Sequence, residues 1–212
     1  FMLASAPAKN GNGLAAWVDY GRDNYAGVTF NGLPANQRIA ISWMSNWQYA
    51  GDVPTDPWRG QMTMPRTLSL VSTGTGPSLR QRPVPGVDAV TVNRDKQQAK
   101  MRSVADGVKP TGIAATVARV EVRVAFGSAS EAGVVLRRSA DGVVGTKVGV
   151  RRDGTLVVDR TRSGDVGFNP LFPSVEEAPV TVRDGEVTCT AYLDRSSVEV
   201  LAEGGQVSVT DL

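Results

Sequence analysis

Apolar and polar residues alternate one by one over short segments of this sequence. In residues 117–124 the set on one side is Val120, Val122 and Val124, and the charged residues between them point the other way. Residues 186–193 repeat the pattern with Val187, Cys189, Ala191 and Leu193. A period of two is typical of an antiparallel strand with one buried face. No window shows an apolar period of 3.6 residues beyond two turns, so we expect no helix.

Dipeptides suited to tight turns separate these segments. They are Asp141-Gly142, Asp153-Gly154, Asp184-Gly185 and Gly204-Gly205. Such pairs tolerate the positive φ angles of short hairpin turns. Short strands joined in this way favour a β-sandwich over a parallel α/β sheet. We place this module at 111–212.

Composition removes several function classes. The 212 residues contain no histidine and one cysteine, Cys189, which excludes histidine-based triads, most zinc sites and an internal disulfide. The 23 basic and 21 acidic residues leave too little charge to indicate a nucleic-acid partner. No apolar run approaches the ~20 residues of a membrane span, so we expect a soluble protein. We also expect no cofactor, and no metal because Asp and Glu are scattered without the spacing of a Ca²⁺ loop.

The chain divides into three parts by composition. Residues 1–70 hold the tryptophans and most tyrosines, 71–110 are rich in Ser, Thr, Gly, Pro and charge, and 111–212 are aliphatic. We interpret the middle part as an extended connector with one or two strands. The sequence opens at Phe1 without a signal peptide, so we expect a piece of a longer product.

Aromatic residues lie among Asp, Asn and Arg in the segments 19–26, 43–49 and 57–66. A sugar ring stacks its apolar face on an aromatic ring, and its hydroxyls bind carboxylates, amides or guanidinium groups. Two simpler interpretations stay open. Each tryptophan could be a core residue, and Asp19 and Asp23 could end a strand or pair with Arg22. In the same way, Arg59 and Arg66 fit surface or linker ion pairs of small energetic value.

The spacing of Asp19 and Asp23 argues against a catalytic pair. Glycosidases hold their two carboxyl groups ~5–5.5 Å apart for retention or ~6.5–9.5 Å apart for inversion. Four residues of extended strand separate Cα atoms by ~13 Å. We therefore expect these side chains to bind hydroxyls.

In these segments the sequence resembles glycoside hydrolase family 32, the invertase, inulinase and levanase group. The matching stretches are Asp-Tyr-Gly-x-Asp-x-Tyr-Ala at 19–26, Trp-Met-x-Asn-Trp-x-Tyr at 43–49, Pro-Trp-Arg-Gly-x-Met at 57–62 and Pro-Arg-x-Leu-x-Leu at 65–70. Residues 193–200 match the closing sandwich signature, with Leu201 where phenylalanine is common. The resemblance implies an all-β chain: the end of a five-bladed β-propeller, followed by a C-terminal β-sandwich.

The resemblance also implies a retaining β-fructosidase acting on levan, inulin or sucrose, and a secreted protein. The family's nucleophile lies in an Asn-Asp-Pro motif, its acid/base in a Glu-Cys motif and a further aspartate in an Arg-Asp-Pro motif. None occurs in this sequence. We therefore expect no catalytic residue in this chain, no activity of the chain alone, and a partner in the N-terminal propeller segment.

The residues carried over are those of the substrate-binding shell. Asp19 matches an aspartate that binds the sugar on the leaving-group side, with Arg22 nearby. Trp47 matches a tryptophan that lines the fructosyl pocket, and Asp23 and Tyr25 lie at the same rim. Two alternatives stay open: a carbohydrate-binding module without catalysis, and a purely structural role in which the chain touches no sugar.

Overall fold

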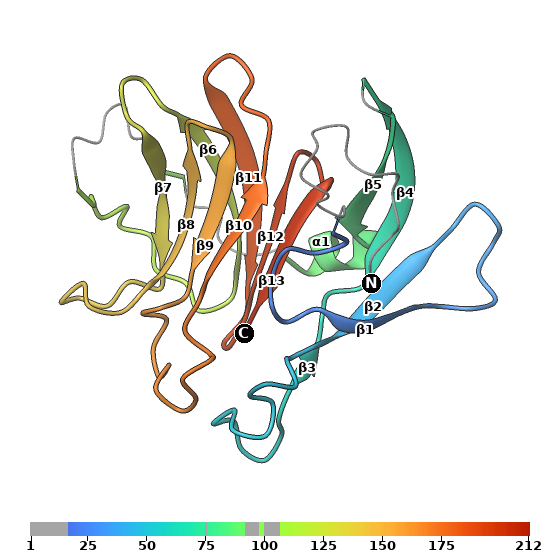
Figure 1. The fold of residues 1–212 in the computed structure, drawn as a ribbon, viewed down its shortest axis with the longest axis horizontal. Coiled ribbons are helices and arrows are strands. Elements are labelled where there is room, and N and C mark those ends of the chain that lie inside the picture. The colour runs from blue at the N-terminus through green and yellow to red at the C-terminus, as the bar shows by residue number, and fades with distance from the viewer. Residues whose placement is uncertain (1–16, 75, 92–97, 100–106) are drawn as a thin grey trace.

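The computed structural model describes residues 17–74, 76–91, 98–99 and 107–212. These residues form three antiparallel sheets and one short helix, which confirms the predicted all-β class (Figure 1). Two of the sheets pack face to face, and the third stands beside them. Within the described part, no helix is long and apolar enough to cross a membrane.

The first sheet comes from the aromatic-rich part of the chain. Its strands are β1 (Tyr25–Thr29), β2 (Ile39–Met44), β3 (Gln61–Met62), β4 (Arg66–Thr73) and β5 (Gly76–Pro83). They follow the order β1-β2-β4-β5, and β3 extends the pairing of β2. Most residues of β1 are exposed, so this sheet alone encloses little core.

The two packed sheets form the predicted sandwich. One sheet contains β7 (Glu131–Leu136), β8 (Thr146–Arg151), β9 (Thr155–Asp159) and β10 (Val175–Pro179), in the order β10-β9-β8-β7. The other contains β6 (Ala118–Ala125), β11 (Glu186–Leu193), β12 (Val198–Ala202) and β13 (Val207–Asp211), in the order β13-β12-β11-β6. The two strands predicted from alternation are β6 and β11, which pair antiparallel with each other.

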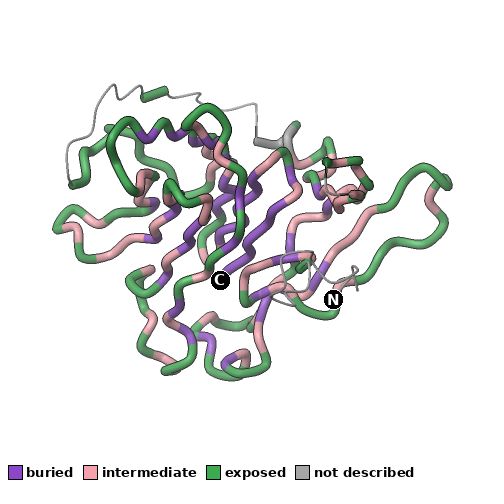
Figure 2. The backbone as a smooth tube through the Cα atoms, turned by 45° about the horizontal axis from the view of Figure 1, so that its top comes forward, coloured by how far each residue is buried: buried purple, intermediate pink, exposed green. Residues whose placement is uncertain are grey.

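The main core lies between these two sheets (Figure 2). Its most enclosed members, all at most 1% exposed, are Val148, Val150, Leu156, Val158, Ala191, Val200, Ala202 and Val209. Each large aliphatic side chain buried in this way contributes ~1.5–3 kcal/mol. Cys189 belongs to the same core, as its place in the alternation predicts, and burial raises the pKa of its thiol to about 11.

The predicted turn dipeptides lie at turns with positive φ. Asp184 and Gly185 have φ of 52° and 74°, which together match a tight hairpin turn. The glycines of the other three pairs also have positive φ; they are Gly142, Gly154, Gly204 and Gly205. Because glycine has no Cβ, it adopts these angles without steric cost.

One helix departs from the prediction. The segment Pro85–Thr91 forms α1, directly after β5. Proline suits the first turn of a helix because its missing N–H has no partner there. At seven residues the helix is too short to show the periodicity that a sequence search requires. The expected connector, 71–110, thus includes the end of β4, β5 and α1 among its described residues; the proposed domain boundaries stay a prediction.

The segment before β1 joins the first sheet to the sandwich. Its backbone lies against β13: the N–H of Tyr20 donates to the carbonyl of Ser208 over 2.8 Å, and that of Asp23 donates to the carbonyl of Thr210 over 3.1 Å. A Cβ on Gly21 would lie 2.1 Å from the Thr210 oxygen. The glycine in the 19–26 motif is therefore needed for this close backbone approach.

Candidate functional site

Asp19, the first predicted site residue, is buried in a hydrogen-bond network. Its Oδ1 accepts bonds from the backbone N–H groups of Gly21, over 2.9 Å, and Thr210, over 2.8 Å. Its Oδ2 accepts from the Thr210 hydroxyl over 2.7 Å, Arg66 Nη1 over 3.0 Å and Asn24 Nδ2 over 3.2 Å. Five donors thus surround this carboxylate within the chain.

Arg66 is the centre of that network, which corrects our interpretation of it as a weak surface or linker ion pair. Its side chain is 3% exposed and lies between two carboxylates, Asp19 at 3.0 Å and Glu199 at 2.5 Å. Desolvation opposes its charge, but both carboxylates favour it, and the net effect is a raised pKa. The network joins β4 to β12 and β13 of the sandwich.

Asp23 occupies a second buried network. Its Oδ1 accepts a hydrogen bond from the Tyr49 hydroxyl over 2.6 Å. Its Oδ2 lies 2.5 Å from Arg160 Nη1 and accepts from the N–H of Leu212 over 2.9 Å. The Arg160 guanidinium also lies 4.2 Å from the ring centroid of Phe172, and both ionic side chains are fully buried. Asp23 therefore joins the first segment to the sandwich, as Asp19 does.

Asp211 adds a second carboxylate beside Arg160. Its Oδ1 lies 3.8 Å from Arg160 Nη1 and accepts a hydrogen bond from the N–H of Arg22, while its Oδ2 has no partner. Burial raises the pKa of this carboxyl to about 8; Arg160 lowers it, and Asp23 and Glu176 raise it further. Burial thus favours the neutral form of Asp211.

The side chain of Arg22, another predicted site residue, faces the sandwich. Its Nε lies 3.0 Å from a carboxylate oxygen of Glu176, and its Nη1 donates to the carbonyl of Leu171 over 3.3 Å. These partners belong to β10 and to the loop that precedes it. The sandwich therefore contacts all three predicted residues, Arg22, Asp19 and Asp23, but each of them belongs to a different ion pair.

Tyr25 and Trp47, the two predicted aromatic residues, both contact Trp43. The ring centroids are 6.1 Å apart for Tyr25 and Trp43 and 4.8 Å apart for Trp43 and Trp47. Tyr25 is 52% exposed and Trp47 is 73% exposed. We call Tyr25, Trp43 and Trp47 the aromatic strip. The rings meet edge-on or tilted rather than stacked, and the exposed faces of Tyr25 and Trp47 suit the apolar face of a sugar.

Local backbone geometry assembles the aromatic strip. Tyr25 on β1 pairs with Trp43 on β2 in register, next to an irregularity in the pairing. After β2 the chain turns at Asn46, whose carbonyl accepts hydrogen bonds from the N–H groups of residues 49 and 50. This turn brings Trp47 back over Trp43. A Cβ on Gly60 would lie 2.6 Å from Trp43 Nε1, so the 57–60 segment packs tightly against the same indole.

Trp43 is the member of the aromatic strip that our site prediction omits. The sequence contains a signal for Trp43, because Trp43 and Trp47 belong to one short motif. Only the strand register, which places Trp43 opposite Tyr25, identifies Trp43 as a member of the strip. The strip and the two buried networks are separate clusters, and the assignment of the five predicted residues to sugar binding stays a prediction.

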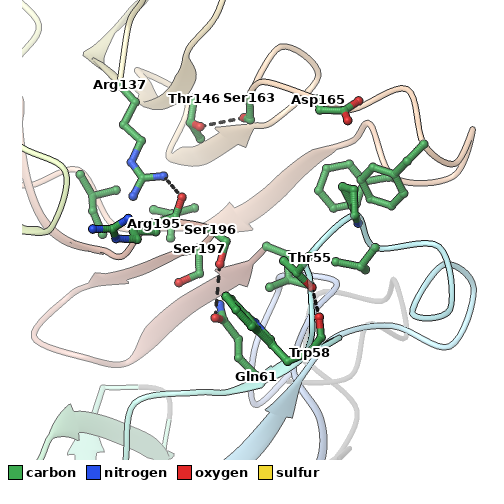
Figure 3. Close-up of a pocket in the computed structure, with 18 residues that line it drawn as sticks. Thr55, Trp58, Gln61, Arg137, Thr146, Ser163, Asp165, Arg195, Ser196 and Ser197 are labelled. Carbon is green, nitrogen blue, oxygen red and sulfur yellow. Dashed lines mark hydrogen bonds between the residues drawn. The ribbon is translucent and has the colours of Figure 1, made fainter.

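A pocket of about 230 Å³ lies where the 53–61 segment meets the sandwich (Figure 3). It contains none of the five predicted site residues. Exposed Trp58 lines it from the 53–61 segment, and Ser196 lines it from the loop before β12, where its hydroxyl contacts Gln61 Oε1 at 3.3 Å. Our sequence reasoning did not predict this pocket, because its two sides are far apart in sequence, at residues 53–61 and 137–212. Among the described residues, no group of three or more His, Cys, Asp or Glu side chains could hold a metal ion.

Comparison with known proteins covers both parts of the chain. Residues 5–83 match the model of the glycosyl hydrolases family 32 N-terminal domain, and residues 79–212 match that of the glycosyl hydrolases family 32 C terminal. The chain is 38% identical to the levanase of Bacillus subtilis, over 92% of this chain and 30% of that protein. It is 35% identical to the extracellular exo-inulinase of Aspergillus awamori, over 94% of this chain and 38% of that protein.

Solved structures give the same result. The crystal structure of the Aspergillus awamori exo-inulinase superposes with a TM-score of 0.87 at 34% identity, covering 95% of this chain and 40% of that one. The β-fructofuranosidase of Schwanniomyces occidentalis shares the fold, with a TM-score of 0.73 at 20% identity. The chain spans about a third of the length of the curated relatives that it matches.

Proposed function

Because the chain belongs to glycoside hydrolase family 32, we propose that it is the C-terminal portion of a retaining β-fructosidase that acts on levan, inulin or sucrose. The first sheet is the end of the propeller, and the two packed sheets are the sandwich. The domain limits that we propose are 1–70, 71–110 and 111–212. In this proposal the reacting carboxylates belong to the rest of the propeller, and a covalent fructosyl-enzyme forms on them.

The exposure of Trp47 is the observation that carries this proposal. A tryptophan that is 73% exposed in the described chain leaves most of its apolar surface in water, which is unfavourable unless a ligand or another segment covers it. Its ring contacts Trp43 at a tilt, with 4.8 Å between the ring centroids, rather than packing into a core. Relatives named levanase and exo-inulinase indicate fructans as the ligand class.

The two buried networks fix the position of the segment that we propose to line the fructosyl pocket. A sugar-binding residue stabilises a transition state only when its position is held closely. Asp19 and Asp23, both in the segment that leads into β1, are fixed to Arg66 and Arg160. We propose that Tyr25, two residues after Asp23, lies at the pocket rim. In this arrangement the contacts of Asp19, Asp23 and Arg22 hold the segment before β1 against the sandwich. Any contact between these side chains and fructosyl hydroxyls occurs in the protein that also contains the rest of the propeller.

We also propose that the protein is exported. Relatives from Aspergillus are named extracellular exo-inulinases, and the composition suits an oxidising compartment as well as a reducing one because the single cysteine is buried.

The test is to join this chain to the N-terminal segment of the Aspergillus awamori exo-inulinase, in place of the matching C-terminal part of that enzyme. We expect the chimera to release fructose from inulin or levan, and the chain alone to release none. Hydrolysis by a clean preparation of the chain alone would contradict the proposal that the reacting carboxylates lie outside this chain. A folded but inactive chimera would contradict the proposal that this chain is the C-terminal portion of a β-fructosidase.

The aromatic strip also favours a second candidate, a carbohydrate-binding module without catalysis, because its rings are already exposed in this chain. Calorimetric titration of the chain alone with inulin and levan separates the two. Binding by the isolated chain, together with an inactive chimera, would favour the binding module.

A further inference from the structure

A polar cleft lies away from the aromatic strip, between the β4–β5 hairpin and one end of the sandwich. Its volume is about 450 Å³. Strand β5 and the loop before β11 bring three arginines to it, Arg80, Arg82 and Arg183. Four hydroxyl residues also line it, Ser72, Thr73, Ser78 and Thr181. We call this the arginine cleft.

The guanidinium groups of the arginine cleft are largely free to bind a ligand. Arg80 donates through Nε to the Ser69 hydroxyl, and Arg82 donates through Nε to the carbonyl of Gly204. Within the described part of the chain, their Nη atoms and the whole guanidinium of Arg183 have no hydrogen-bond or ion-pair partner. In the two buried networks, by contrast, Arg66 and Arg160 each form an ion pair with a carboxylate.

The single acid in the lining does not neutralise the arginines. Glu203 has a positive φ of 52°, and its Oε1 accepts a hydrogen bond from the N–H of Thr181. It lies beyond ion-pair distance of the three arginines, so the lining holds three positive groups and one negative group, a net charge of +2. Walls of one sign focus the field and attract ligands of opposite charge.

The frame of the arginine cleft is held by backbone contacts. The N–H of Gln81, between the two arginines of β5, donates to the carbonyl of Gly205 over 2.7 Å. A Cβ on Gly205 would lie 1.8 Å from the Gln81 oxygen, so the turn between β12 and β13 rests directly on β5. Because Arg80 and Arg82 are two residues apart on one strand, their side chains start from the same face.

From this geometry we infer that the arginine cleft binds oxyanion groups carried on a polysaccharide: sulfate, phosphate or carboxylate. Guanidinium groups pair with such groups through two parallel N–H bonds, which neutral sugars cannot accept as strongly. A water molecule takes about 30 Å³, so a free anion of four oxygens would fill only part of this volume. The remaining space and the hydroxyl lining suit the sugar units of a polymer.

The test uses the complete chain and two matched triple variants. In the first, Arg80→Gln, Arg82→Gln and Arg183→Gln remove the cleft charges. In the second, Arg38→Gln, Arg138→Gln and Arg162→Gln remove the same net charge from exposed positions outside the cleft. Circular dichroism confirms that each variant folds. Calorimetric titration at ~50 mM salt then uses heparin, polygalacturonate, inorganic sulfate and neutral dextran as probes.

We expect heparin or polygalacturonate to bind the parent chain, and the cleft variant to lose about tenfold or more in affinity. The control variant should stay within about twofold of the parent, and dextran should not bind. Affinity for sulfate equal to that for the polymers would show that a free anion, and not a polymer, is the ligand. An equal loss in both variants, or no binding of any anion, would overturn the inference. Neither result depends on fructosidase activity, so this test stands apart from that of the proposed function.

Discussion

Arg66 Nη1 lies 3.0 Å from Asp19 Oδ2, and both side chains are 97% buried although 47 positions separate them in sequence. Asp19 in turn accepts two hydrogen bonds from Thr210 of β13. One buried guanidinium therefore holds together the first sheet, the segment that precedes it and the sandwich. Arg160 and Asp23 form a second buried ion pair, which also joins the segment before β1 to the sandwich.

We expect the Arg66→Gln substitution to destabilise the chain strongly. It leaves two buried carboxylates, Asp19 and Glu199, without their counter-charge, and such a break costs about 3–5 kcal/mol. Urea unfolding followed by tryptophan fluorescence measures the loss. The matched control is Arg38→Gln at an exposed site, which should stay within about 0.5 kcal/mol of the parent. Equal free energies of unfolding for the two variants would refute the role of the network.

Gly21→Ala tests the close approach of the first segment to β13. The new Cβ would lie 2.1 Å from a backbone oxygen of Thr210, so the backbone must shift, at a cost of about 1–3 kcal/mol. Gly51→Ala is the control because nothing lies within 4 Å of a Cβ there. Thermal unfolding of both variants gives the comparison. A Gly21→Ala protein as stable as Gly51→Ala would mean that the segment does not pack on β13 in this way.

Asp211 gives the chain a stability that falls as pH rises. Its folded pKa, raised by burial to about 8, lies above its unfolded value, so the folded state holds a proton that the unfolded state has released. This stabilisation is complete below the unfolded pKa of ~4 and is lost as pH rises to about 8, with a slope of at most ~1.4 kcal/mol per pH unit.

The Asp211→Asn variant isolates this effect, because the amide keeps the shape and cannot ionise. Urea unfolding at pH 5, 6, 7 and 8 should give a parent curve that declines more steeply than the variant curve. Parallel curves would show that the carboxyl is already ionised in the folded protein at pH 5.

The sandwich could be predicted from the sequence because its strands and turns are indicated by residues that are neighbours in the chain. Alternation in β6 and β11 depends on neighbouring residues, and so does the positive φ at Asp184-Gly185. The family resemblance rested likewise on short motifs in order. These signals predict the all-β class, the strands β6 and β11 and the core position of Cys189.

The buried networks could not be predicted because their partners are distant in sequence. Arg160 and Asp23 are 137 positions apart, and nothing near Arg160 indicates that it is fully buried. Burial of an arginine depends on carboxylates that only the tertiary fold supplies. For the same reason Asp19 and Asp23 were predicted as binding residues by motif alone, without their internal partners, and the pocket at Trp58 was not predicted.

The most direct test of the account is the activity of the chimera with Trp47→Ala on inulin and levan, measured as kcat/KM. The change should leave the free energy of unfolding within about 0.5 kcal/mol, because the side chain is mostly exposed. Trp58→Ala, an exposed tryptophan outside the aromatic strip, is the control. We predict that Trp47→Ala lowers kcat/KM by about tenfold to 100-fold relative to that control, the loss of one stacked ring in the transition state. An unchanged kcat/KM in a folded Trp47→Ala chimera would contradict the claim that this chain forms part of the fructosyl pocket.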